Sequence, residues 1–283
     1  MLTKRTFALA AIFGAAFWGC QQSGGNLDDA ERWATDFVAN FQQIMPQVPL
    51  LQSQKSNMLD EKEAYAVQQQ VIDKFRASGE KMIGYKLGLT GKVRPFGAPE
   101  PVYGQLWSSM QLAQSDTVRL SHFVQAMVEV ELAFYFADDV DYPVAPEQLR
   151  KAVAAVAPAI ELPDLAFSSM ENLSYLDLIA ANVGARHLIV GEKQPISNVD
   201  INALQVRIAH NGALAGQGSA SAVMGDQWSA LAFLAEKLHA RDKKIKAGEV
   251  VLTGTMTAMS PAKVGRYDAD FGELGSLYFW CKP

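Results

Sequence analysis

Four stretches of the chain repeat apolar residues at intervals of three and four, which is the period of an amphipathic helix. They are residues 28–44, 61–78, 146–156 and a segment that begins at Asp226. The second stretch also carries boundary signals, because Asp60 and Glu63 match a capping box at its start and Gly79 is a natural stop at its end. We therefore expect four helices.

Seven shorter apolar runs, separated by glycine-containing turns, predict strands. They are residues 81–89, 127–136, 158–162, 186–190, 204–210, 249–254 and 274–281. These strands outnumber the helices and do not alternate with them one by one. This order favours an α+β fold with a curled mixed sheet over a doubly wound fold.

The strand predicted at 127–136 carries two acids in an otherwise apolar run, Val-Glu-Val-Glu-Leu. Alternate side chains of a strand share a face, so Glu129 and Glu131 lie on one face about 7 Å apart. Two carboxylates at this spacing repel each other unless water or a cation separates them. The pair indicates either the wet face of an ordinary strand or half of a metal site.

A third isolated acid, Glu161, ends another apolar run thirty residues after Glu131. Three carboxylates without a histidine or a thiol suit a hard cation, Mg²⁺ or Mn²⁺. The four histidines are scattered and the sequence holds no C-x-x-C or H-x-x-x-H pair, which argues against zinc. Spacing alone also allows three solvated strand ends, so both interpretations stay open.

Two further positions carry polar groups in apolar surroundings. Lys86 lies in a predicted strand between Gly84 and Gly88, which leave room for a ligand or another backbone. Burial there would disfavour the ammonium form, which suits proton transfer. Thr253 and Thr255 end another strand, where they could bind a substrate carboxylate. A solvated lysine and a polar turn are the alternative interpretations.

The bulk composition is that of a globular protein. The chain has 283 residues, of which 49% are hydrophobic and 19% charged, and its net charge is −5. No Lys/Arg stripe is present, so we expect no nucleic-acid partner.

The first twenty residues differ from the rest. Lys4 and Arg5 precede a short apolar run, which predicts a signal peptide over residues 1–19. Gly19 followed by Cys20 resembles the lipobox of bacterial lipoproteins, which implies lipidation of Cys20. We expect a flexible tether over 20–27 and a single domain over 28–283. The protein would then be exported and anchored on the periplasmic side, at the outer membrane.

A plain cleaved signal is the alternative to lipidation. In that case the only other cysteine, Cys281, could form a disulfide with Cys20 in an oxidising compartment.

Four segments taken in order carry a family resemblance: "GEKMIGYKLGLT", "MVEVELAF", "VAPAIELPD", and "LTGT" followed by "VGRYDADFGELGSL". Together they resemble the 2-keto-4-pentenoate hydratase group of the fumarylacetoacetate hydrolase-like superfamily, which also includes oxalocrotonate decarboxylases. The resemblance covers about residues 60–283. It implies a mixed β-roll with flanking helices, a homo-oligomer, an Mg²⁺ or Mn²⁺ ion held by Glu129, Glu131 and Glu161, and an acid/base role for Lys86.

The expected function is that of a metal-dependent lyase acting on small 2-oxo acids. It would hydrate a 2-hydroxy-2,4-dienoate to a 4-hydroxy-2-oxo acid. The cation would act as a Lewis acid that stabilises an enolate, and Lys86 would move the proton at carbon. Thr253 and Thr255 would orient the substrate carboxylate.

Three departures from the family pattern leave other functions open. Val102 and Ala181 stand where the family has aspartates, and Ala166 stands where it has an arginine. A 2-oxo acid decarboxylase and a ligand-binding lipoprotein that has lost the reaction are therefore alternatives. A C–C bond hydrolase would need a histidine–glutamate pair, for which His122 is the histidine in question. A structural role for His122 is the other interpretation.

Overall fold

The computed structural model describes residues 24–53, 60–114 and 116–283. The predicted signal peptide at 1–19, the lipidation site Cys20 and the first part of the tether lie outside the described residues. Within the described ranges, no helix combines the length and the apolar character needed to cross a membrane.

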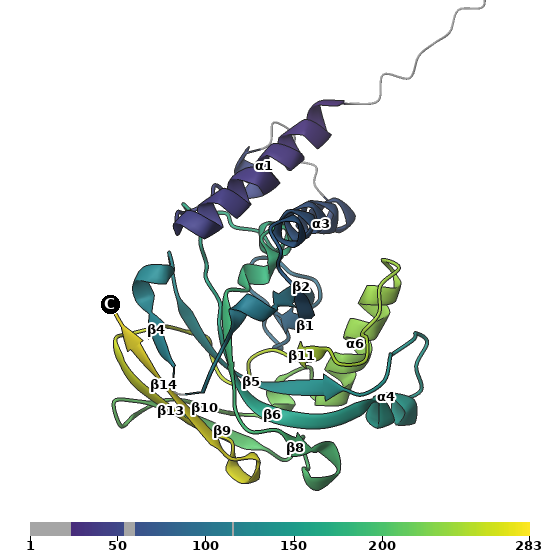
Figure 1. Ribbon diagram of the computed structural model, residues 1–283, viewed down its shortest axis with the longest axis vertical. Coiled ribbons are helices and arrows are strands. Elements are labelled where there is room, and N and C mark those ends of the chain that lie inside the picture. Colours follow the sequence, from purple (N-terminus) through teal and green to yellow (C-terminus); the bar gives the residue numbers. More distant parts are fainter. Residues whose placement is uncertain (1–23, 54–59, 115) are drawn as a thin grey trace, which may run out of the picture.

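One large sheet forms the centre of the molecule (Figure 1). Its main path runs in the order β2 (Val102–Trp107), β1 (Met82–Gly88), β11 (Val250–Leu252), β5 (Met127–Phe136), β6 (Val153–Leu162), β7 (His187–Val190) and β3 (Gln111–Leu112). Two short strands join it at the side: β12 (Ser260–Pro261) pairs with β5, and β8 (Gln194–Pro195) pairs with β6.

A second, five-stranded sheet packs beside the first. Its order is β10 (Ala213–Ser219), β9 (Gln205–His210), β13 (Gly265–Asp270), β14 (Ser276–Lys282) and β4 (Thr117–Arg119). Parallel and antiparallel pairs both occur in each sheet, so the fold is the α+β arrangement of mixed, curled strands that the sequence predicts.

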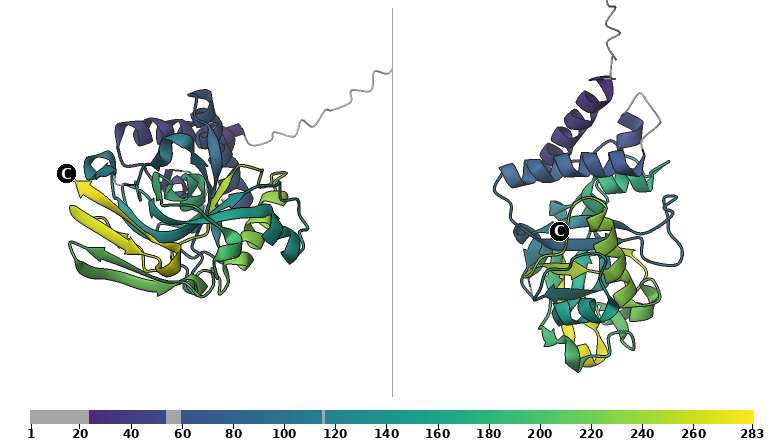
Figure 2. Two further views of the ribbon diagram at one scale, coloured as in Figure 1. Left: turned by 60° about the horizontal axis from the view of Figure 1, so that its bottom comes forward. Right: turned by 90° about the vertical axis from the view of Figure 1, so that its right-hand side faces the viewer.

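Two groups of helices flank the sheets (Figures 1 and 2). The first group is α1 (Gly24–Gln43), α2 (Leu50–Ser53), α3 (Glu61–Ala77) and α5 (Tyr175–Ala180), and the second is α4 (Pro146–Ala152) with α6 (Gln227–His239). Six single-turn helices complete the described part of the chain: η1 (Ser108–Met110), η2 (Leu120–His122), η3 (Asn182–Gly184), η4 (Ile196–Asn198), η5 (Ala220–Ala222) and η6 (Gly272–Leu274).

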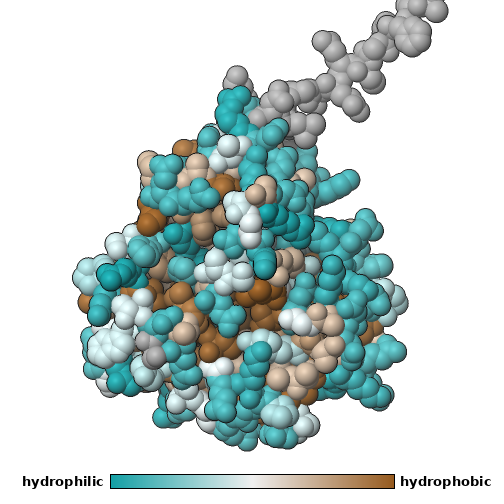
Figure 3. Space-filling view, viewed as in Figure 1, coloured by the Kyte–Doolittle hydropathy of each residue, from teal (hydrophilic) through white to brown (hydrophobic). Residues whose placement is uncertain are grey.

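The alternation of side chains along β5 separates two hydrophobic clusters. Val130 and Phe134 point into the larger cluster, where Phe134 packs 6.1 Å from Trp228 of α6 between ring centroids. Ala133, on the opposite face, belongs to the cluster that includes Trp33 of α1 and Val71 of α3. On the face shown in Figure 3, apolar residues gather in the middle of the molecule, over the central strands, and over part of α1. The acids of β5 share the face of Ala133.

Several boundaries follow the sequence. The capping box of α3 is confirmed, because the Asp60 carboxylate accepts from the Glu63 N–H at 2.8 Å and the Glu63 carboxylate accepts from the Asp60 N–H at 2.9 Å. Asp226 caps α6 by accepting from the N–H of Ser229. Buried Cys281 lies in β14, and burial raises the pKa of its thiol to about 11.

Other boundaries differ from the prediction. The first helix begins at Gly24, so part of the expected tether at 20–27 is helical; glycine is tolerated there because a helix end carries little of the interior penalty. The helix predicted over 146–156 is α4, which ends at Ala152, and the residues after it belong to β6. Val153 and Val156 are buried there, and β-branched residues favour a strand that pairs with β5 over its full length. Strands β2, β10 and β13 were not predicted.

Candidate metal and active site

Strand register brings the three glutamates together. Glu129 of β5 lies directly opposite Glu161 of β6, and Glu131 follows two residues along the same face of β5. Each residue offers one carboxylate oxygen, and these oxygens all lie within 4.8 Å of one another. The sheet therefore builds a compact oxygen cluster from residues thirty positions apart.

Lys86 reaches this cluster from β1, with β11 between it and β5. Its Nζ lies 2.6 Å from Glu161 Oε1 and donates a hydrogen bond to the Val183 carbonyl at 3.1 Å. The side chains are almost fully enclosed: Lys86 is 2% exposed, Glu131 0% and Glu161 1%, whereas Glu129 is half-buried. Solvent or a ligand would thus approach the cluster most directly from the side of Glu129.

The charges in this site are unbalanced, because three carboxylates face one ammonium. Burial raises the pKa of Glu129 to about 7, and burial together with the carboxylates of Glu161 and Glu129 raises the pKa of Glu131 well above its ordinary value. Burial alone lowers the pKa of Lys86, but the attraction of Glu161, Glu129 and Glu131 outweighs it and the net pKa is raised. The sequence-based expectation of a weakened ammonium form is therefore wrong for Lys86 beside these three carboxylates.

Three carboxylate oxygens in the cluster, Glu131 Oε1 and both oxygens of Glu161, have no hydrogen-bond partner among the described residues. Of these, only Glu161 Oε1 is compensated by an ion pair, with Lys86 Nζ at 2.6 Å. A buried carboxylate oxygen without a partner is costly. Hard oxygen donors with excess negative charge fit a divalent cation such as Mg²⁺ or Mn²⁺, so these residues suit the ion that the sequence predicts.

The other oxygen of Glu131 is held by backbone. The Gly254 N–H donates to Glu131 Oε2 at 2.8 Å. Gly254 has φ +104°, and the hydroxyl of Thr90 occupies the space that a Cβ at this position would need. Only glycine meets both requirements. Thr90 is 3% exposed and belongs to the Gly-Tyr-Lys segment, but nothing in its spacing indicated a contact with Gly254.

The two threonines proposed for substrate binding have different surroundings. Thr253 is fully buried, and its hydroxyl donates to Gln227 Oε1 of α6 at 2.6 Å, so it is not available to a substrate. This disagrees with the role expected of Thr253. The half-buried Thr255 hydroxyl accepts from the Val130 N–H at 3.3 Å, which places it against β5 close to the glutamates.

A strained turn holds the carbonyl that binds Lys86. Asn182, Val183 and Gly184 have φ values of 53°, 54° and 67°, so three successive residues are left-handed. This conformation is unfavourable for a β-branched residue such as Val183. The side chain of Asn182 fixes the turn, since it accepts from the Gln105 N–H at 2.7 Å and donates to the Gln105 carbonyl at 2.8 Å.

The two glycines beside Lys86 make room for protein atoms. A Cβ at Gly84 would overlap the backbone of Val250 in β11. A Cβ at Gly88 would lie 2.7 Å from Val183 Cγ1. The first case matches the expected close approach of a backbone, and the second is a side-chain contact that the sequence did not reveal.

Of the three positions that depart from the family pattern, Val102 and Ala181 are buried and Ala166 is half-buried. Val102 of β2 pairs with Gly88, and Ala181 ends α5. Asp164 accepts hydrogen bonds from the N–H groups of Val124 and Gln125, at 3.0 Å and 2.7 Å for its closest oxygens, so it stabilises a backbone turn. His122 is exposed on η2 and is not part of the carboxylate cluster.

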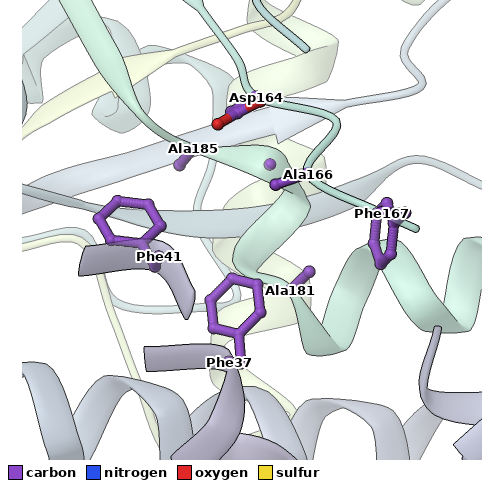
Figure 4. A pocket seen from close by; sticks show the side chains of 8 residues that line it. Phe37, Phe41, Asp164, Ala166, Phe167, Ala181 and Ala185 are labelled. Carbon is purple, nitrogen blue, oxygen red and sulfur yellow. The ribbon is translucent and has the colours of Figure 1, made fainter. Parts of the chain in front are cut away.

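Helix α1 packs against the segments that carry Asp164, Ala181 and Ala185 (Figure 4). Phe37 and Phe41 face Asp164, Ala181 and Ala185 across a cavity of about 10 Å³, which is space for a single water molecule. The cavity is therefore a small packing gap.

Comparison with known proteins agrees with this geometry. Residues 79–274 match the family model described as fumarylacetoacetate (FAA) hydrolase C-terminal. A 2-keto-4-pentenoate hydratase of Burkholderia vietnamiensis is 29% identical over 219 residues, which cover 76% of this chain and 83% of the relative. A 2-hydroxyhexa-2,4-dienoate hydratase of Comamonas testosteroni is 31% identical over 221 residues, with the same coverage of both chains.

The fold has a close counterpart among solved structures. The 4-oxalocrotonate decarboxylase of Pseudomonas putida G7, complexed with magnesium and adipate, superposes with a TM-score of 0.86. The match covers 90% of this chain and 98% of the other, at 23% identity. With the family model matching most of the sequence, the chain belongs to the fumarylacetoacetate hydrolase C-terminal family.

Proposed function

We propose that the protein is a divalent-metal-dependent hydro-lyase that adds water to a 2-hydroxy-2,4-dienoate and forms a 4-hydroxy-2-oxo acid. The observation that carries this proposal is the convergence of Glu129, Glu131, Glu161 and Lys86 in one enclosed cluster. The names of the two hydratase relatives, each similar over about three quarters of this chain, support the substrate class.

The three glutamates would hold Mg²⁺ or Mn²⁺, with the free oxygens of Glu131 and Glu161 as ligands. When bound, such an ion supplies a Lewis acid for the carboxylate and 2-oxo oxygens of a substrate. The magnesium complex of the structurally similar decarboxylase and the Mn²⁺ and pyruvate complex of a fumarylpyruvate hydrolase from Pseudomonas aeruginosa, with a TM-score of 0.56, support a hard cation.

The protein's own groups would orient the reaction. Glu161 and the Val183 carbonyl hold Lys86 Nζ at the edge of the carboxylate cluster, where it can give a proton to a substrate carbon or accept one. The Gly254 N–H fixes the rotamer of Glu131. Thr255 is the remaining threonine that we assign to the substrate carboxylate, because the Thr253 hydroxyl is engaged by Gln227.

Decarboxylation of a 2-oxo acid is the second candidate function. Val102, which pairs with Gly88, places an apolar side chain where the family pattern has an aspartate, so this position supplies no carboxylate to activate water. Loss of CO₂ needs an electron-withdrawing cation and a proton donor but no activated water. The fold similarity to a 4-oxalocrotonate decarboxylase is consistent with this alternative.

Turnover assays test both reactions. Purified protein is assayed with 2-hydroxypenta-2,4-dienoate and with 4-oxalocrotonate, each with and without Mg²⁺. We expect Glu129→Gln and Lys86→Met to lower kcat/KM for the true substrate by about 100-fold or more, and the exposed Lys151→Gln to leave it unchanged.

Two results would contradict the assignment. Activity that persists in both site variants would exclude the proposed mechanism. Binding of oxalate that requires Mg²⁺, without turnover of either substrate, would favour a ligand-binding protein that has lost the reaction.

Export, lipid anchoring at Cys20 and self-association remain proposals from the sequence alone. Mass spectrometry of the mature N-terminus distinguishes a lipidated Cys20 from a plain cleaved signal. Sedimentation velocity of the purified protein measures the oligomeric state.

A further inference from the structure

A separate cleft of about 640 Å³ opens against β1 and β2. Tyr85 and Gln105, which pair across these strands, line it. Because successive residues of a strand face opposite ways, Tyr85 points away from the face that carries Lys86. The cleft shares no residue with the carboxylate cluster, and its volume is in the range of small-molecule sites.

The residues that line this cleft carry more positive than negative side chains, although the whole chain has a net charge of −5. Five cationic side chains line it, together with three acidic ones. The cations are Arg76, Arg241, Lys243, Lys244 and Lys246, and the acids are Asp141, Asp242 and Glu249. The cations come from the end of α3 and from the segment that follows α6, so two distant parts of the chain build one basic surface.

Ion pairs neutralise only part of this charge. Lys244 lies 2.8 Å from Asp139 and 3.1 Å from Asp141, Arg241 lies 3.0 Å from Glu61, and Arg76 lies 4.0 Å from Asp73 in a largely exposed pair. Lys243 has no carboxylate partner among the described residues, and its ammonium donates instead to the side-chain carbonyl of Gln69.

The ammonium of Lys243 is the group in greatest need of an anion. Burial lowers the pKa of Lys243, and the guanidinium groups of Arg76 and Arg241 lower it further. Asp73 opposes this effect without reversing it. A bound anion would relieve the repulsion among these three cations.

Gln105 adds a second requirement on the ligand. Its side chain is 1% exposed, and its Oε1 has no hydrogen-bond partner among the described residues. A buried carbonyl left unpaired costs about 1–3 kcal/mol. Two hydrogen bonds with Asn182 fix the backbone of Gln105, so its side chain stays on the face of β2 that lines the cleft. A turn of the side-chain amide toward the cleft would let a ligand hydroxyl donate to this oxygen.

We propose that this cleft binds a small organic polyanion that also carries a hydroxyl group. Its negatively charged groups face Lys243, Arg76 and Arg241, and its hydroxyl donates to Gln105 Oε1. Carboxylate and phosphate groups share this chemistry, and both are recognised by arginine and lysine. The proposal is independent of the reaction at the carboxylate cluster.

Calorimetry on the full chain, stripped of metal with EDTA and then dialysed, tests the site with chosen probes. Citrate carries three carboxylates and a hydroxyl, tricarballylate is the same molecule without the hydroxyl, and 3-phosphoglycerate carries a phosphate, a carboxylate and a hydroxyl. We expect citrate or 3-phosphoglycerate to bind with a Kd of about 1 mM or tighter. The tighter of the two identifies the preferred anion, and tricarballylate should bind about tenfold more weakly than citrate.

Matched variants locate the binding. Lys243→Gln and Arg76→Gln should each weaken binding about tenfold or more, and Lys151→Gln, which removes an equal charge from exposed α4, should not. The Arg76 side chain is 51% exposed, so we expect Arg76→Gln to fold like wild type. This variant therefore tests the site even if Lys243→Gln folds poorly.

Three outcomes would overturn the proposal. They are the absence of binding by citrate and 3-phosphoglycerate at about 10 mM, equal binding by Arg76→Gln and wild type, and equal binding of citrate and tricarballylate, which would remove the role of Gln105.

Discussion

Glu131 shows how a single residue is shaped by its neighbours. Its Oε2 accepts a hydrogen bond from the Gly254 N–H, and its Oε1 has no partner among the described residues. The carboxylate also lies close to those of Glu129 and Glu161. Like charges in an enclosed site favour the protonated form of at least one of them. A divalent ion would remove this conflict, so metal binding and stability should be linked at this residue.

Replacing Glu131 by glutamine tests that link. Glu131→Gln keeps the shape of the side chain and an oxygen for Gly254, but it removes a ligand charge. If wild type gains about 2.7 kcal/mol at a hundredfold excess of Mg²⁺ over Kd, a variant with hundredfold weaker affinity gains about 0.4 kcal/mol. Without metal at pH 8, the variant should be at least as stable as wild type, because a repelling buried carboxylate is gone.

Urea unfolding with EDTA and with Mg²⁺ measures both effects. The exposed Glu236→Gln on α6 is the control, and it should respond to Mg²⁺ as wild type does. An equal gain from Mg²⁺ in wild type and in Glu131→Gln would show that Glu131 does not bind the ion.

His187 carries a separate pH dependence. Burial lowers its pKa to about 4 from an ordinary 6.5, so the unfolded chain binds a proton between these values and the folded chain does not. The free energy of unfolding should therefore have its full value above pH 6.5 and should fall as the pH drops toward 4, by at most about 3 kcal/mol from this residue.

His187→Gln should lose less stability than wild type between pH 7.5 and pH 5. The exposed His239→Gln, measured in the same urea titrations, should behave like wild type, and equal losses in all three proteins would contradict this role.

At the scale of residues, the sequence predicts which side chains lie together more reliably than it predicts their pKa values. The period of two places Glu129 and Glu131 on one face, and the isolated acid at 161 completes the set. The pKa of Lys86 could not be predicted in this way, because it depends on carboxylates that reach it across three neighbouring strands.

At the scale of elements, the site depends on how η3 packs on β1. The left-handed Val183 covers Gly88 and presents its carbonyl to Lys86. Helix α3 and strand β5 could be read from periodicity and capping. The turn at 182–184 could not, since a valine gives no sign of a positive φ; tertiary contacts impose this conformation against local preference.

The contact between Gly88 and Val183 can be tested by a double-mutant cycle. Gly88→Ala should destabilise the protein by about 1–3 kcal/mol, because the new Cβ would lie 2.7 Å from Val183 Cγ1. Val183→Ala removes that methyl group, so the double variant should recover about 1–2 kcal/mol relative to the sum of the single changes. Gly91→Ala is the control in the same segment, since its Cβ would have 3.7 Å to the nearest atom. Additive effects in urea unfolding would exclude the contact.

At the scale of the whole molecule, α1 is joined to the body by aromatic packing and one guanidinium. The Arg186 Nη1 donates to the Phe41 carbonyl at 2.8 Å, and its guanidinium carbon lies 3.9 Å from the centre of the Phe41 ring. Periodicity predicted that α1 has an apolar face. It could not indicate that this face covers the region behind Asp164 and Ala181, because that depends on a contact between residues far apart in the chain.

Arg186→Lys tests whether this contact fastens α1 to the sheet. Lysine keeps the positive charge but loses the planar group that stacks on Phe41 and binds the last turn of the helix. We expect amide hydrogens of residues 33–41 to exchange about tenfold faster in the variant, and those of β5 and β6 to exchange at the wild-type rate, because the sheet keeps its own ladder of hydrogen bonds. Arg32→Lys is the matched control on α1, since the Arg32 side chain is 71% exposed and stacks on no aromatic ring of the described residues. Faster exchange in both variants would point to a general loosening of α1, and unchanged exchange in Arg186→Lys would assign its attachment to the apolar contacts of Trp33 and Phe37 alone.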